Sequence, residues 1–140
     1  MSETILITIL IAFISAFIIL YVNRLNYYRS AANKFRDKIF TIFKGLYPNP
    51  VDWPENRAFI VNILIDKFPE LDSAVAEFRP FIPFYKRWLF DRAWFRYRCS
   101  TGRKIDTQCY HHYIEFGSNP GYKDNFHRNV SKLLSFAKVK

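Results

Sequence analysis

The chain of 140 residues has few cysteines and few glycines. Its two cysteines form no Cys-x-x-Cys pair, which excludes a disulfide-rich domain, a zinc ribbon and a c-type haem attachment site. Four glycines and a hydrophobic content of 50% exclude collagen-like, linker-like and intrinsically disordered chains. The chain is instead rich in aromatic side chains, at 19%, and its excess of cations gives a formal net charge of +9.

The sequence also lacks the common catalytic motifs. It has no glycine-rich phosphate loop, nucleophile elbow or His-Glu-x-x-His motif. Glu115 lies within one helical turn of two histidines, but no second Glu-x-x-His would complete a di-iron site. We therefore expect a protein that is not an enzyme and that binds no cofactor or metal. In a reducing cytoplasm, its two thiols should stay free. The soft ligands, which lack the paired spacing of a zinc site, are Cys99, Cys109, His111, His112 and His127.

Residues 4–23 contain no charged side chain and are mostly Ile, Leu, Phe, Val and Ala. A helix of this length measures about 30 Å at 1.5 Å per residue, which matches the hydrocarbon core of a bilayer. No cation precedes the segment, and bulky side chains occupy 18–21, where a signal peptide would be cleaved. The pattern predicts an uncleaved membrane anchor at 1–23, rather than a signal peptide or a buried core helix.

Cations follow this segment at Arg24, Arg29, Lys34, Arg36 and Lys38, and none precedes it. Because retained cations determine the orientation of a membrane helix, the N-terminus is predicted to be periplasmic and the C-terminal part cytoplasmic. We therefore expect a single-pass membrane protein.

One face of the predicted span bears small side chains, at Thr8, Ala12, Ser15 and Ala16. Small residues let a second transmembrane helix approach closely, so this face is a candidate packing site. The alternative is that Ala, Ser and Thr are simply common in such helices.

A helical seam follows the span, because apolar residues recur at steps of three and four. We expect an amphipathic juxtamembrane helix over 24–47, packed either on the protein's own domain or on a partner or second copy. The seam residues are Leu25, Tyr28, Ala32, Phe35, Ile39, Ile42 and Leu46.

Residues 48–140 are predicted to form a small cytoplasmic domain, which makes the fold mainly α with one transmembrane helix. Helices are expected at 54–67, from Pro69 to about 79, at 84–99 and at 124–137. The first of these helices has Asp52 as its expected N-cap, and Pro69 is expected to open the second. Residues 109–116 fit either a strand or a helix.

Four segments resemble a group of small bacterial single-pass membrane proteins of uncharacterised function, over about half of the chain. The resemblance implies a bacterial inner-membrane protein and transfers no activity or site residue. The segments are Phe68-Pro69 and residues 74–81, 90–94 and 133–138.

Residues 86–104 form the most unusual segment, because seven cations stand against Asp91 alone among aromatic side chains. The pattern fits a solvated basic face, or a surface for anionic lipid headgroups, nucleic acid or an acidic protein partner. Attachment to a membrane favours lipid and protein over nucleic acid. The candidate surface residues are Lys86, Arg87, Trp88, Arg92, Trp94, Arg96, Arg98, Arg103 and Lys104.

Thirteen of the fifteen phenylalanines and all three tryptophans lie outside the span, which indicates that a partner covers part of the domain. We therefore expect a non-catalytic accessory subunit that stabilises or assembles a larger inner-membrane complex. The alternative is a membrane-tethered module that binds anionic lipid headgroups or nucleic acid.

Overall fold

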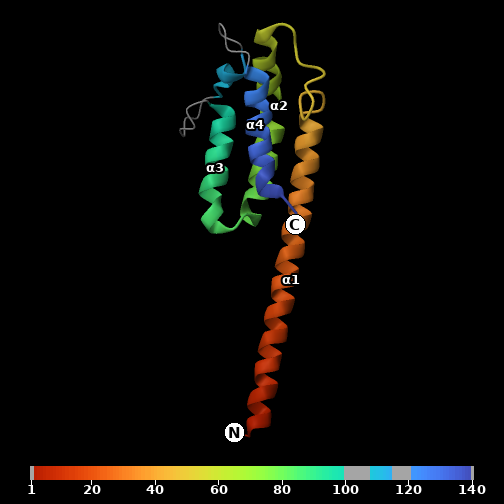
Figure 1. Cartoon of the computed structure of the whole chain (residues 1–140), viewed down its shortest axis with the longest axis vertical. Coiled ribbons are helices and arrows are strands. Elements are labelled where there is room, and N and C mark those ends of the chain that lie inside the picture. The colour runs from red at the N-terminus through yellow and green to blue at the C-terminus, as the bar shows by residue number, and fades with distance from the viewer. Residues whose placement is uncertain (1, 100–107, 115–120, 140) are drawn as a thin grey trace.

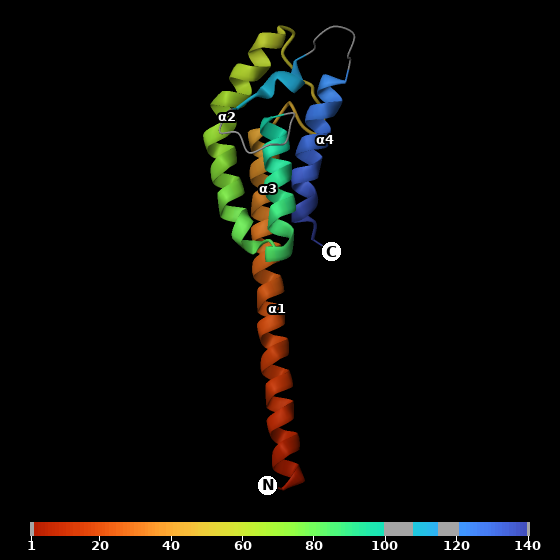
Figure 2. The same ribbon diagram turned by 90° about the vertical axis from the view of Figure 1, so that its left-hand side faces the viewer.

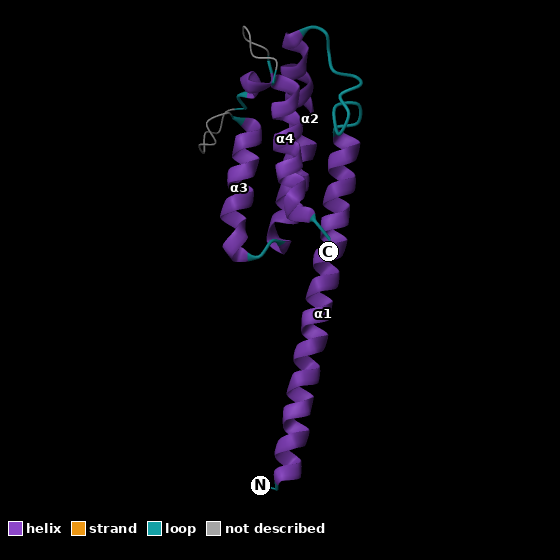
Figure 3. Ribbon diagram, in the orientation of Figure 1, coloured by secondary structure: helices purple, strands orange, loops and turns teal. Residues whose placement is uncertain are grey.

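The computed structural model describes residues 2–99, 108–114 and 121–139. These residues are mainly helical and include no strand, only an isolated bridge between Cys99 and Cys109 (Figure 3). The prediction of a mainly α fold is confirmed. The elements are α1 (Glu3–Ile42), α2 (Arg57–Phe78), η1 (Arg79–Phe81), α3 (Phe84–Arg98), η2 (Tyr110–Tyr113), α4 (Tyr122–Leu134) and η3 (Ser135–Ala137).

Helix α1 is continuous over 40 residues and is therefore about 60 Å long. Its N-terminal half projects beyond the rest of the molecule, and its C-terminal half packs beside the other helices (Figure 1). No proline or glycine occurs before Gly45, so nothing interrupts the helix where the apolar segment ends. Gly45 has φ of +83°, a left-handed conformation that suits glycine and ends the helix.

The C-terminal half of α1 and helices α2, α3 and α4 form an up-down-up-down four-helix bundle. Figures 1 and 2 together place α1 diagonally opposite α3, and α2 diagonally opposite α4. The long connection between α1 and α2 lies at the end of the bundle far from the projecting half of α1. The turn from α2 through η1 to α3 lies at the near end (Figure 1).

The amphipathic seam of α1 faces the interior of this bundle. Five of its seven residues are buried in the core together with residues of all the other helices. The seam therefore packs on the protein's own domain, as one of the two predicted alternatives stated. The buried seam residues are Ala32, Phe35, Ile39, Ile42 and Leu46.

Aromatic rings fill the core in two layers. Near the projecting half of α1, the Phe35 ring stacks on Phe78 at 4.6 Å between centroids, and Phe90 meets both rings edge-on. Toward the opposite end, the Phe126 ring meets Phe43 edge-on at 5.2 Å. The domain thus buries much of its aromatic content by itself.

Helix α2 differs from the sequence prediction in two respects. It runs unbroken through Pro69, which was expected to begin a separate helix, and its N-cap is Asn56 rather than Asp52. Proline removes one backbone donor, but its ring lies on the exposed side, while Leu64 and Leu71 on either side of it are fully buried. Continuous burial of one apolar face therefore outweighs the lost hydrogen bond. The Asn56 side chain accepts a hydrogen bond from the Ala58 N–H at 3.1 Å.

The remaining helices agree more closely with the prediction. Helix α3 matches the helix expected at 84–99, and α4 continues into η3 over the range expected at the C-terminus. Of the ambiguous segment 109–116, the described part forms the short helix η2.

Candidate functional site

The apolar half of α1 lies outside the bundle. Its most apolar 18-residue window has a mean hydropathy of 3.0, and none of that window is buried against the rest of the chain. By length and composition, α1 is the one described helix that could cross a membrane. The Thr8 hydroxyl donates to the Thr4 carbonyl at 2.8 Å, so this polar group is satisfied within the helix.

Thr8, Ala12, Ser15 and Ala16 are exposed on one face of the projecting half of α1. Beyond Ile19 and Asn23, the same face bears small polar residues in the half that packs in the bundle, on the side away from the buried seam. We name the whole set the α1 stripe. Sequence analysis missed its second half, although the same spacing would have extended it. The additional exposed members are Asn26, Ser30, Asn33, Asp37 and Thr41.

An open groove of about 700 Å³ borders the stripe between α1 and α2. From α1 it is lined by four stripe residues, Ser30, Asn33, Asp37 and Thr41, and from α2 by Glu70 and Ser73. Lys34, Lys38 and Ile42 of α1 complete the lining. Because the groove is open rather than enclosed, it suits a helix or an extended segment of another chain.

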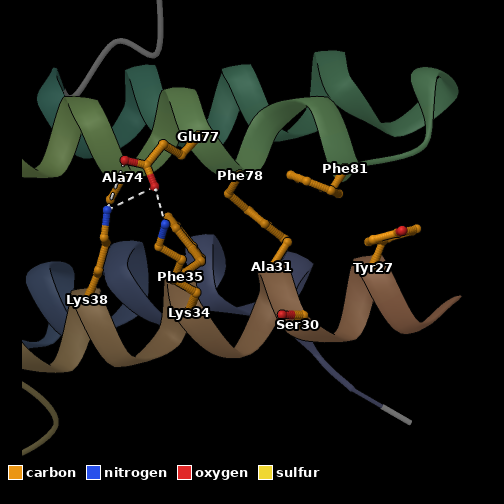
Figure 4. A pocket seen from close by; sticks show the side chains of 10 residues that line it. All are labelled: Tyr27, Ser30, Ala31, Lys34, Phe35, Lys38, Ala74, Glu77, Phe78 and Phe81. Carbon is orange, nitrogen blue, oxygen red and sulfur yellow. Dashed lines mark hydrogen bonds and ion pairs between the residues drawn. The ribbon is translucent and has the colours of Figure 1, made fainter. Parts of the chain in front are cut away.

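A second cavity of about 400 Å³ lies between the same helices, closer to the projecting half of α1 (Figure 4). Glu77 of α2 bridges two α1 lysines there, with its carboxylate 2.9 Å from Lys38 Nζ and 3.1 Å from Lys34 Nζ. The hydrogen bond from Lys38, then that from Lys34, lowers the pKa of Glu77. Tyr27 and Phe81 face each other at the far end of the cavity (Figure 4).

The predicted basic and aromatic surface is only partly present on the exterior. Lys86, Trp88, Arg92 and Arg96 are exposed and Arg87 is half-buried. Arg103 and Lys104 lie outside the described residues. Trp94 and Arg98, by contrast, are buried at 6% and 9% exposure, so their assignment to an interaction surface is corrected.

The burial of Trp94 and Arg98 has a common physical cause. The Arg98 guanidinium lies 5.0 Å from the Trp94 ring centroid and 4.7 Å from that of Phe95, in cation–π contact with both. The Trp94 ring stacks on Phe68 of α2 and on Tyr97. The periodicity of α3 alone could not distinguish these positions, since aromatics occupy most of its circumference.

Four exposed aromatics gather where η1 meets α3. Their exposed fractions are 43% for Phe81, 80% for Phe84, 59% for Tyr85 and 59% for Trp88. We call this set the aromatic corner. It lies at the end of the bundle from which the apolar half of α1 emerges (Figure 1).

Two arginines hold the backbone of this corner. Arg79 donates from Nε and Nη2 to the two carboxylate oxygens of Asp91, at 2.7 and 2.8 Å, which links η1 to α3. Asp91 also raises the pKa of Arg79, so the pair stays charged. Arg87 donates to the carbonyls of Ile82 and Pro80 at 3.0 and 2.9 Å. Arg87 thus has a structural role that sequence analysis did not foresee.

The cysteine and histidine residues do not converge on a metal site within the described part of the chain, where no three His, Cys, Asp or Glu side chains cluster. The centroids of the His112 and Tyr113 rings lie 3.8 Å apart. Burial of the His112 imidazole lowers the pKa of this side chain. His127 lies on α4 beside the Tyr47 ring. Glu115, considered with the histidines above, lies outside the described residues.

Comparison with known proteins adds no family to these observations. No family model, curated protein or solved structure matches the chain. The functional argument therefore depends on the surfaces just described.

Proposed function

We propose that this protein is a non-catalytic, single-pass accessory subunit of a larger inner-membrane complex. Residues 4–23 cross the bilayer, and the bundle lies on the cytoplasmic side because the cations of α1 all follow the span. The anchor and the bundle share one uninterrupted helix, so a partner that holds the anchor also fixes the position of the bundle.

The observation that supports a partner is the division of α1 into two faces. One face is buried in the bundle, while the α1 stripe on the other side remains exposed from Thr8 to Thr41. Lipid-facing helices do not need small residues, whereas a packed membrane helix does. A partner helix that follows the whole stripe would contact small residues within the bilayer and polar ones beyond it.

The charges beside the stripe favour a different protein over a second copy of this chain. Arg29 and Arg36 lie on one side of the stripe, Lys34 on the other side is paired with Glu77, and Asp37 is the only acid of α1 after the span. Two copies anchored in the same orientation would pair parallel and bring like charges together, which is destabilising. A partner helix with acidic residues just beyond its own span would be complementary.

The experiment tests contact and packing separately in native membranes. A photo-crosslinking amino acid at Asn26, on the stripe, should give an adduct with a distinct protein, and the same amino acid at exposed Tyr27 should give less. The double variant Ala12→Leu with Ala16→Leu fills the small-residue face and should reduce the adduct severalfold. Adding bulk to the opposite face with Leu10→Phe and Ile14→Phe should leave it unchanged.

Two results would contradict the proposal. One is the absence of any adduct from Asn26 while the protein is extracted by mild detergent as a lone monomer. The other concerns the anchor itself: release by alkaline carbonate, or a periplasmic signal from a reporter fused after Lys140, would overturn the membrane topology.

A further inference from the structure

We propose that the aromatic corner inserts into the headgroup region of the membrane that α1 crosses, and so seats the bundle on the inner leaflet. The inference depends on the proposed membrane anchor and goes beyond it, because an anchored bundle could equally stand clear of the lipid. Its occupant is the bilayer surface itself.

The first argument is the position of the corner along α1. Phe81 lines the same cavity as Tyr27, and η1 packs against α1. Tyr27 follows the last residue of the apolar segment by four positions, which is about 6 Å along a helix at 1.5 Å per residue. The headgroup region is about 5–7 Å thick on each side of the hydrocarbon core, so Phe81 and the start of α3 reach it when α1 stands across the bilayer.

The second argument is the chemistry of the exposed side chains. Tryptophan and tyrosine prefer the membrane–water interface, where an apolar ring and a polar tip are both satisfied. Within the bundle, Phe84 is nearly as exposed as a side chain can be, at 80%, on a domain that otherwise buries much of its aromatic surface. Water is a poor environment for such a cluster, and the lipid interface is a favourable one.

The third argument is charge. Lys86 is exposed in the first turn of α3 beside the corner, and the acid Asp91 is paired with Arg79. The cytoplasmic leaflet has a negative surface potential, which attracts a cation held at this depth. Anionic lipids are therefore complementary to the corner, and an acidic protein surface is the alternative that the experiment must separate.

The corner is also fixed before it meets the lipid. The Arg79–Asp91 pair and the Arg87 hydrogen bonds hold η1 on α3, and Pro80 and Pro83 restrict the intervening backbone. Little side-chain or loop entropy is then lost on insertion, because the four rings already share one edge of the bundle.

The experiment uses the intact chain reconstituted in phosphatidylcholine vesicles with a minority of phosphatidylglycerol. Part of the lipid carries bromine either close to the headgroup or near the end of the acyl chain, since bromine quenches tryptophan only at short range. Because Trp88 is one of three tryptophans, shallow bromine should remove about a third of the emission at most, and deep bromine much less. Trp88→Phe should abolish the quenching, and Trp53→Phe, at the far end of the bundle, should preserve it.

A charge variant tests insertion without removing the reporter. Phe84→Asp should reduce the quenching about twofold or more, because a carboxylate resists entry into the interface. Its fold can be checked by thermal unfolding, which should be unchanged at so exposed a position. If the wild type and Trp88→Phe are quenched equally while both still float with the vesicles, the aromatic corner does not insert and the proposed membrane anchor stands. Failure to float would overturn both.

Discussion

The Tyr28 hydroxyl donates a hydrogen bond to the backbone carbonyl of Phe136, 108 positions further along the chain. It joins the C-terminal η3 to α1 at the level where that helix enters the bundle. Partial burial raises the pKa of the Tyr28 hydroxyl, which keeps the donor proton in place. The bond therefore closes the bundle at the end that faces the proposed membrane.

Removing this bond should destabilise the bundle measurably. Tyr28→Phe keeps the ring and deletes the donor, so we expect a loss of about 1 kcal/mol in the free energy of unfolding. Denaturant unfolding of the full chain in detergent, followed by circular dichroism, measures it. Tyr27→Phe is the matched control, because Tyr27 is 68% exposed. Equal stability of the two variants would show that the Tyr28 bond contributes nothing.

Truncating a buried aromatic of α3 should cost more stability than truncating an exposed one. Phe90 is fully buried and contacts Phe35 and Phe78, so Phe90→Ala should cost about 3–5 kcal/mol and unfold much of the population. Phe84→Ala removes a ring that is 80% exposed, and its cost in detergent should be within about 0.5 kcal/mol. Comparable losses in the two variants would contradict the assignment of Phe84 to the surface.

The bridge between Glu77 and its lysines predicts a dependence of stability on acid. Since the folded state lowers the pKa of Glu77, the unfolded chain binds its proton more readily, and the stabilisation present at neutral pH is lost as the pH falls below the ordinary pKa of 4.5. Glu77→Gln should therefore flatten the dependence of the unfolding free energy on pH in that range. Glu70→Gln removes one carboxylate from the same helix without touching the bridge, and so serves as the matched variant. A Glu77→Gln profile parallel to that of the wild type would refute the bridge.

Pro69 predicts a stabilising substitution. Its side chain is exposed in the middle of α2, where proline removes a backbone donor and costs up to about 3 kcal/mol. Pro69→Ala should raise the free energy of unfolding by about 1–3 kcal/mol if α2 is as continuous as described. A loss of stability would instead indicate that the helix needs a break at Pro69.

Local sequence patterns predicted the elements whose signals do not depend on packing partners. The uncharged run at 4–23 and the seam through Phe35 and Ile39 correctly predicted helical structure in both segments, and a buried face in the second. The same reasoning misread Pro69, because a proline rule applied locally does not include the burial of Leu64 and Leu71 on either side of it.

Surface assignment was the weaker part of the sequence prediction. Helix α3 has aromatic or cationic residues on most of its circumference, so periodicity did not separate buried Trp94 and Arg98 from exposed Trp88 and Arg92. Phe81 showed no distinguishing signal, because it lies in η1 outside any regular pattern.

The sequence by itself determined that the chain is helical, that one end is apolar enough to enter a bilayer and that one face of the following helix is buried, because composition and period are local properties. Only the tertiary structure decided which side chains remain outside. It brought Phe81, Phe84 and Trp88 together at the end of the bundle from which the apolar half of α1 emerges, and left the α1 stripe uncovered on the opposite side from the core. The physical reason is that exposure depends on which helices lie side by side, and the four helices of a bundle can be arranged in more than one way.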